Sequence, residues 1–220
     1  MKKTILIAFL LIGIFSGIKQ SYGDTIPDDF MLWTELKIKY QIKPSKFVFV
    51  WGTESRFDDG ASEYMLFNTT VGFYYKVAKW FQTGLYYRLE KELGKNTENR
   101  VFPQGTFKVK AGPVKFAFRN RFEIRMFTSG ETRFRYRLRI KFGPKFKVAT
   151  ITLNPFVFNE FFFETKKSND GFNQDRLGTG LTIGFLKGLV KYTPYFMVRF
   201  DQKDPWIHRY VFGNKVELTF

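Results

Sequence analysis

The sequence predicts an all-β protein: a transmembrane antiparallel up-and-down β-barrel of roughly 10–12 strands. Three observations support this prediction: a signal-like start, alternation of charged and apolar residues along most of the chain, and an aromatic last residue, Phe220. The 220 residues are 44% apolar, which is too many for a disordered chain, and their number suits one domain. Because the sequence has no cysteine, it excludes disulfides, a thiol nucleophile, a Cys-ligated zinc and a lipoprotein anchor.

The first residues predict export. A short basic start is followed by an uncharged stretch from Thr4 to Gly17, and small residues stand three and one before Asp24. This order is typical of a secretory signal peptide, and the apolar run is shorter than the roughly 18 residues of a membrane span. We therefore expect a cleaved signal peptide at residues 1–23 and an outer-membrane β-barrel domain at residues 24–220. An uncleaved anchor helix is the alternative.

The net charge of +16 would also suit a nucleic-acid-binding protein. Removal of residues 1–23 takes away three lysines and no acid, which leaves +13. An exported bacterial-type chain does not meet the chromosome, so we expect no nucleic-acid partner. With one histidine and no cysteine, we also expect no metal and no cofactor.

The rest of the chain alternates with a period of two. Within Thr132–Phe142, basic residues at odd positions, from Arg133 to Lys141, alternate with apolar residues at even positions. A helix would scatter both sets around its surface, so this segment is a strand between two different environments. The same alternation recurs in Thr34–Tyr40, Phe81–Glu90, Lys115–Met126, Gln174–Phe185 and Arg209–Phe220.

The connections alternate as well, as they do in up-and-down barrels with short turns at one end and longer loops at the other. Short links are expected near residues 43–45, 78–79, 112–113, 143–145 and 187–188. Longer polar links are expected at residues 58–62, 93–98, 128–132, 166–171 and 202–205. Aromatic residues near the strand ends predict girdles at both membrane interfaces: Trp33, Trp51, Tyr74, Tyr75, Trp80, Tyr86, Tyr87, Phe161, Phe162, Phe163 and Trp206. A soluble β-sandwich is the competing architecture.

The C-terminal strand carries a pattern similar to the terminal signal of bacterial outer-membrane proteins. Its apolar residues alternate up to the chain end: Phe212, Val216, Leu218 and Phe220. We expect periplasmic chaperones and the barrel-assembly machinery as partners during biogenesis, outer-membrane lipid or lipopolysaccharide around a monomer, and a location in the outer membrane.

The strand count is harder to predict. About eleven segments alternate, whereas single-chain bacterial barrels have even numbers of strands. Either Leu32–Gln41 lies in the lumen and ten strands remain, or two strands are merged and there are twelve.

Several short stretches, in order, resemble one protein family. They are Trp33–Glu35, Glu54–Arg56, Gly84–Arg88, Arg119–Arg125, Arg135–Arg139, Asn159–Phe161 and Gln174–Arg176. The chain is similar, over nearly all of its mature length, to the domain of unknown function 2490 family of small bacterial outer-membrane barrels. This resemblance implies a barrel in the outer membrane and supplies no activity.

The polar face of the predicted strands holds the candidate functional residues. They are Arg56, Arg88, Arg119, Arg121, Arg125, Arg133, Arg135, Arg137, Arg139 and Arg176, with Glu54, Glu90, Glu123 and Glu160. One interpretation is a packed network of ion pairs that fills a narrow barrel. The other is an anion-attracting narrow channel or binding pocket, because a cluster of like charges focuses the electric field on opposite charge.

A lipid-modifying enzyme, such as a lipase or deacylase, is the alternative class of function. Its histidine base would have to be His208, which Arg209 and Tyr210 follow with no adjacent serine. An interfacial histidine in the aromatic belt is the simpler interpretation, so we do not expect an enzyme. Lysines in the longer links could pair with lipid phosphates: Lys95, Lys166, Lys167 and Lys203.

Overall fold

The structure is a computed structural model that describes residues 30–165, 171–202 and 207–220. The expected signal peptide at residues 1–23 lies outside the described residues, as do Trp206, Lys166, Lys167 and Lys203.

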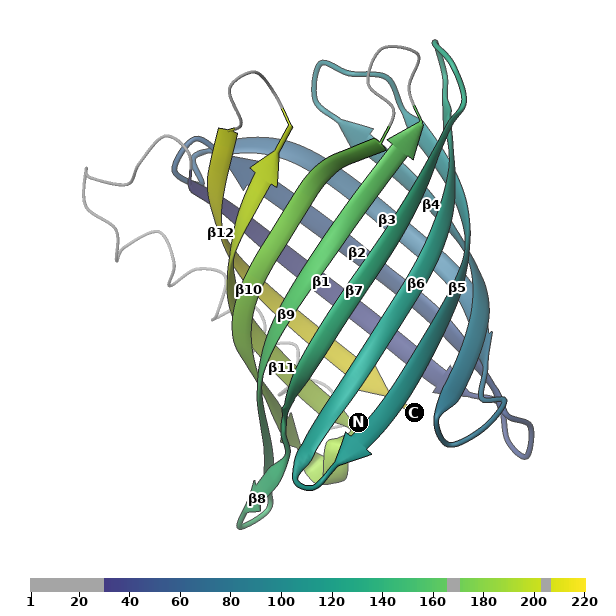
Figure 1. The fold of residues 1–220 in the computed structure, drawn as a ribbon, viewed down its shortest axis with the longest axis vertical. Helices are drawn as coiled ribbons and strands as arrows, with labels where there is room; N and C mark the ends of the chain where they lie inside the picture. Colours follow the sequence, from purple (N-terminus) through teal and green to yellow (C-terminus); the bar gives the residue numbers. More distant parts are fainter. Residues whose placement is uncertain (1–29, 166–170, 203–206) are drawn as a thin grey trace, which may run out of the picture.

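Within the described ranges, eleven strands form one closed wall (Figure 1). They are β1 (Phe30–Gln41), β2 (Phe47–Asp58), β3 (Glu63–Tyr75), β4 (Phe81–Glu92), β5 (Glu98–Ala111), β6 (Val114–Phe127), β7 (Arg133–Pro144), β9 (Ile151–Thr165), β10 (Gly171–Phe185), β11 (Val190–Asp201) and β12 (Ile207–Thr219). The three-residue strand β8 (Phe146–Val148) pairs with the start of β9 in a hairpin that projects beyond the wall. A short 3-10 turn, η2 (Leu186–Gly188), joins β10 to β11.

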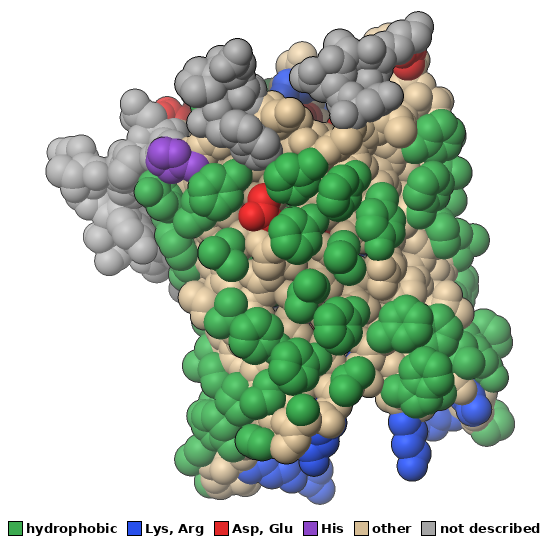
Figure 2. Space-filling model, viewed as in Figure 1, with side chains coloured by type: hydrophobic (Ala, Val, Ile, Leu, Met, Phe, Trp, Pro, Cys, Tyr) green, Lys and Arg blue, Asp and Glu red, His purple; other side chains and the backbone are tan. Residues whose placement is uncertain are grey.

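The alternation predicted from the sequence sorts side chains between the two faces of the wall. In β7, Phe134 and Tyr136 point outward and are 43% and 38% exposed, whereas Arg137 points inward and is 7% exposed. Hydrophobic side chains cover the outer surface in the same way (Figure 2). Across the described part of the chain, no helix is long and apolar enough to cross a membrane. The wall therefore has an apolar outer face and a polar lumen, as an outer-membrane-type barrel requires.

The first and last strands close the wall by parallel pairing. β1 runs beside β12 in register from Phe30 with Tyr210 to Lys39 with Thr219, and every other neighbouring pair is antiparallel. Backbone hydrogen bonds extend this seam to the chain end, from the Gln41 amide to the Phe220 carbonyl (2.8 Å) and from the Phe220 amide to the Lys39 carbonyl (2.9 Å).

The wall has eleven strands, within the expected range of roughly 10–12 and equal to the number of alternating segments, whereas the two even counts, ten and twelve, are wrong. The segment Leu32–Gln41 lies in the wall as part of β1, with Leu36 and Ile38 outward and charged residues inward. Evenly spaced parallel hydrogen bonds satisfy the backbone of both terminal strands, so an odd number of strands leaves no open edge.

The links gather at two opposite ends of the barrel, as the sequence predicts. We call one end the turn end, where residues 42–46, 76–80, 112–113, 145–150 and 186–189 connect strands. We call the other the loop end, where residues 59–62, 93–97 and 128–132 connect strands. The four residues of the predicted assembly signal, Phe212, Val216, Leu218 and Phe220, follow the outward face of β12 toward the turn end.

The predicted aromatic girdles are only partly correct. Trp51 and Trp80 point outward, but Trp33, Tyr86 and Phe162 point into the lumen and are 4%, 8% and 1% exposed. Consecutive residues of a strand necessarily face opposite sides, so aromatic pairs such as Tyr86-Tyr87 must place one ring inside. Some of the aromatic side chains therefore pack inside the lumen and do not contribute to a girdle.

Candidate functional site

The lumen brings together all fourteen residues that the sequence singles out. Twelve of them line a cavity of about 1810 Å³, whose lining reaches residues of both the loop end and the turn end. The other two, Glu123 and Glu160, are fully buried beneath arginine side chains. Twenty-two basic and seven acidic side chains line this cavity, so its surface is strongly cationic.

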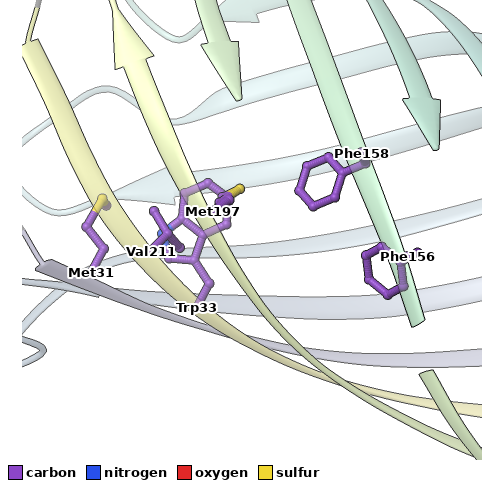
Figure 3. Close-up of a cluster of buried hydrophobic side chains, with 6 residues drawn as sticks. All are labelled: Met31, Trp33, Phe156, Phe158, Met197 and Val211. Atoms are coloured by element: carbon purple, nitrogen blue, oxygen red, sulfur yellow. The ribbon is translucent and has the colours of Figure 1, made fainter. Parts of the chain in front are cut away.

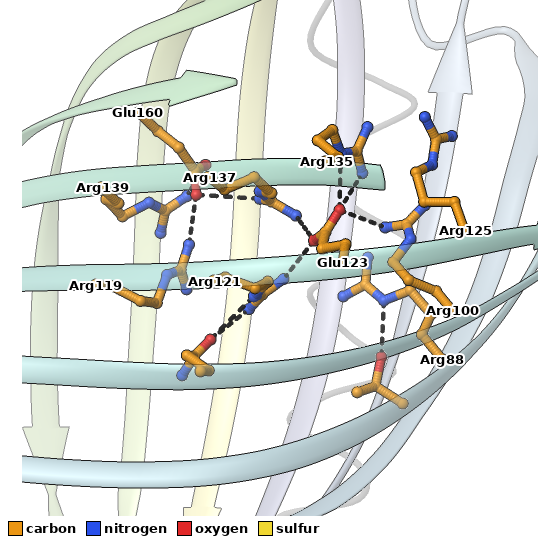
Figure 4. Close-up of polar contacts among 12 residues, drawn as sticks. Arg88, Arg100, Arg119, Arg121, Glu123, Arg125, Arg135, Arg137, Arg139 and Glu160 are labelled. Atoms are coloured by element: carbon orange, nitrogen blue, oxygen red, sulfur yellow. Dashed lines mark hydrogen bonds and ion pairs between the residues drawn. The ribbon is translucent and has the colours of Figure 1, made fainter. Parts of the chain in front are cut away.

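Glu123, on β6, organises one group of arginines (Figure 4). Its carboxylate accepts a hydrogen bond from Arg135 at 2.7 Å and one from Arg137 at 2.8 Å. Arg121 donates at 3.3 Å, and Arg100 completes the group at 3.8 Å. These partners come from β5, β6 and β7, so one buried carboxylate ties three strands together.

Glu160, on β9, organises the second group. Arg119, Arg137 and Arg139 approach its carboxylate at 2.6, 3.1 and 2.9 Å, and Arg176 on β10 lies at 4.0 Å. Arg137 contacts both buried carboxylates and so joins the two groups across β6, β7 and β9. We call the lumen around Glu123 and Glu160 the arginine section. Burial of a carboxylate is costly unless it is paired, and here each has several cationic partners.

Further ion pairs extend the arginine section towards the loop end. Glu98 pairs with Arg100 and Arg125, each at 2.7 Å, and Arg125 also pairs with Glu164. Glu90 accepts from Arg100 at 3.1 Å. On β2, Glu54 pairs with Arg56 at 2.5 Å, and on β4 the Arg88 Nε donates to Thr70 at 2.9 Å.

The sequence analysis missed Glu98 and Arg100 of β5, although both are almost fully buried in the lumen. They continue the alternation, with Asn99 and Val101 on the outward face. Pro103 obscured this strand, because proline removes a ladder donor and usually argues against an interior strand.

Several guanidinium groups of the lumen pack over aromatic rings. Arg56 lies 3.9 Å above the Trp33 ring, and Arg137 lies 4.5 Å above the Phe162 ring. Part of this support is a buried cluster from β1, β9, β11 and β12, shown in Figure 3: Met31, Trp33, Phe156, Phe158, Met197 and Val211. Gly180 makes room for this cluster, since a Cβ there would lie 2.7 Å from the Cζ atom of Phe156.

The turn end of the lumen has a different charge pattern. Glu217 pairs with Lys39 at 2.6 Å and with Lys191 at 2.7 Å, and Glu35 pairs with Lys215 at 2.7 Å. Five further lysines line the cavity there without an acidic partner among the described residues. We call these five the lysine cluster: Lys115, Lys141, Lys145, Lys147 and Lys187.

His208 does not join the lumen. It lies exposed on the outward face of β12 near the loop end, with its ring edge-on to Tyr210 at 5.6 Å (Figure 2). Among the described residues, it makes no hydrogen bond to a serine. Lys95, the one described lysine of those proposed to bind lipid phosphate, bonds to Glu92.

A family model described as a protein of unknown function, DUF2490, matches residues 30–207. The chain belongs to the DUF2490 family. The match covers the wall from β1 to the first residue of β12, so the arginine section of this DUF2490 protein lies within the family region, whereas most of β12 lies beyond it. No curated protein matches its sequence.

Two solved structures resemble the DUF2490 barrel. LpxR from Salmonella typhimurium has a TM-score of 0.50 and 8% identity, and the match covers 79% of this chain and 83% of that chain. A bacterial polysaccharide outer membrane secretin has a TM-score of 0.48 and 9% identity, with 76% and 73% covered. At such low identity, the likeness to LpxR bears on the fold alone and supports an outer-membrane-type barrel.

Proposed function

We propose that this DUF2490 protein is a barrel of the bacterial outer membrane whose lumen attracts small anions and serves as a narrow channel for them. One observation carries the proposal: a cavity of about 1810 Å³ is lined from one end of the barrel to the other, and basic side chains predominate along it. A passage lined by one sign of charge concentrates ions of the opposite sign.

An anion that passes along the lumen must pass the arginine section. Glu123 and Glu160 neutralise part of its charge, but each carboxylate faces four arginines within 4.0 Å. The excess of cations opposes the entry of other cations, and the remaining donors can replace part of an anion's hydration shell. We therefore expect small conductance and anion preference.

Planar-bilayer recordings test the channel. Under a KCl gradient, the reversal potential should show preference for chloride. Replacement of two exposed cavity-lining lysines, Lys145→Glu with Lys147→Glu, should shift that potential towards cation preference. Lys91→Glu is the control, because Lys91 lies exposed on the outward-facing side of β4. Silent bilayers, or cation preference in the unmodified protein, would reject the channel.

The location rests on the apolar outer face and on the signal-like residues 1–23. Fractionation of cells that express the full chain should recover the protein in outer membranes, in a form whose gel mobility changes on heating. Recovery in soluble periplasmic extract would contradict both the location and the membrane role.

We do not propose an enzyme. A lipid hydrolase would need a nucleophile near His208, and the described residues provide no serine hydrogen-bonded to it. Lipid analysis of cells that overexpress the protein should match that of cells that express His208→Ala.

A further inference from the structure

The lysine cluster gathers at one place although its members come from separate elements. Lys115 begins β6, Lys141 lies near the end of β7, Lys147 lies on β8 and Lys187 lies in η2. Strand register brings these elements together: Lys115 lies opposite Gly143 of β7, Lys147 opposite Thr152 of β9, and Thr152 opposite Gly184, just before η2. The five lysines therefore lie around one mouth of the lumen, at the turn end.

These lysines have little to neutralise them. Lys141 sits 3.3 Å above the Phe156 ring, where repulsion by Arg139, Lys215 and Arg119 outweighs attraction by Glu217. The five turn-end links contain seven lysines and no Asp or Glu. Figure 2 shows basic side chains gathered at that end of the molecule. Repulsion of this kind is relieved when an anion binds between the cations.

Neutral polar groups complete the mouth. Thr152, Thr182, Thr193 and Asn154 line the same cavity, from β9, β10 and β11. There is free space beside Gly184, where an added Cβ would meet nothing nearer than Thr152, at 3.4 Å. The site thus combines several ammonium groups, hydroxyl groups and space.

We propose that the lysine cluster binds a ligand that bears at least two phosphate groups and enters from the turn end. This proposal rests on the anion-attracting lumen and names the class of anion. Lysine binds phosphate as a point charge, and threonine hydroxyls can donate to phosphate oxygens. Five cations, four from separate elements and Lys145 from the link between β7 and β8, match a ligand with several charged oxygens better than they match a single carboxylate or chloride.

The arginines of the arginine section differ from the lysine cluster in this respect. Those around Glu123 and Glu160 already hold a carboxylate, whereas the lysine cluster has no acidic partner among the described residues. Exposed lysines around the same end extend the positive field outward and would steer a polyanion to the mouth: Lys43, Lys46, Lys76, Lys79, Lys108 and Lys110.

Binding of tripolyphosphate to the purified barrel in uncharged detergent tests the proposal by calorimetry, with citrate and chloride at equal ionic strength as competitors. Lys145→Gln with Lys147→Gln, and separately Lys141→Gln, should each weaken tripolyphosphate binding about tenfold per charge removed. The matched control for Lys141→Gln is Lys91→Gln, which removes one charge near the loop end, on the outward face of β4 and outside the cavity, and should leave affinity unchanged. A heat-dependent gel shift verifies that each variant is folded.

A phosphate-bearing lipid headgroup could supply the same chemistry. A second experiment therefore measures the thermal stability of the barrel in nanodiscs of phosphatidylglycerol and in nanodiscs of phosphatidylcholine. Tripolyphosphate binding that the turn-end variants abolish supports a soluble ligand. Stabilisation by phosphatidylglycerol alone, lost in the same variants, supports a headgroup. Equal behaviour of turn-end and loop-end variants with both probes, or citrate binding as tight as tripolyphosphate, overturns the proposal.

These outcomes are separable from those of the channel. Calorimetry needs no current, so tripolyphosphate binding in a barrel that is silent in bilayers would reject the channel and leave this site. Anion-selective conductance, together with equal binding of tripolyphosphate and citrate, would support the channel and reject this site.

Discussion

The arginine section and the lysine cluster lie in one lumen, yet they solve the problem of enclosed charge in opposite ways. In the arginine section, two fully buried carboxylates each hold several guanidinium groups, and aromatic rings support those groups. In the lysine cluster, the cations have no acidic partner among the described residues and face open space and hydroxyl groups. The first arrangement cross-links the wall, whereas the second leaves charge available for a ligand.

The largest expected effect comes from removal of a buried carboxylate. Glu160→Ala leaves Arg119, Arg137 and Arg139 without their shared partner, and we expect a loss of about 3–5 kcal/mol in the free energy of unfolding. Urea titration of the refolded barrel measures this loss. Glu92→Ala is the control, because its pair with Lys95 is solvent-exposed and should contribute less than about 1 kcal/mol. Equal losses would mean that the arginine section does not cross-link the wall.

Substitution of two glycines, Gly180 and Gly184, tests whether the lumen is packed more tightly beside the buried aromatic cluster than beside the lysine cluster. Gly180→Ala would press on the Pro194 carbonyl and the Tyr195 Cβ, each at 2.7 Å, and should cost about 1–3 kcal/mol. Gly184→Ala, beside the lysine cluster, finds ordinary contact distance and should change stability by no more than about 0.5 kcal/mol. Both substitutions add the same methyl group, and only the surroundings differ. Similar urea midpoints for the two variants would show that packing around Gly180 is no tighter than around Gly184.

The smallest effect is expected within the lysine cluster itself. Lys141→Met keeps an apolar stem over Phe156 and removes a charge that three cations repel, so stability should change by less than about 1 kcal/mol. Added salt should stabilise the unmodified barrel more than this variant, because salt screens the repulsion that the variant lacks. A loss as large as that of Glu160→Ala would show that Lys141 is a structural cation.

Period-two alternation was enough to predict the barrel, the two faces and the inward direction of the arginines, because side-chain direction in a strand is fixed by parity. It could not predict which carboxylate forms an ion pair with which arginine. That pairing depends on register between neighbours, and a bulge such as the one at Arg56/Phe57 shifts it.

Parity also explains what the sequence analysis misjudged. Trp33 and Phe162 belong to the lumen set of their strands, but their apolar character placed them in the membrane girdles. The odd number of strands was rejected for another reason, since the pattern of one strand does not reveal whether its neighbour runs parallel or antiparallel.

The parallel seam between β1 and β12 has a kinetic consequence. It joins residues that are far apart along the chain, as the hydrogen bond from Lys215 to Glu35 across 180 positions illustrates. All the other wall pairings join strands that follow one another closely in sequence, so a growing sheet can zip together locally. Closure alone must await the last strand, and contacts of such high sequence separation form slowly. A chain that ends before Ile207 would therefore remain an open, curved sheet with two unsatisfied edges.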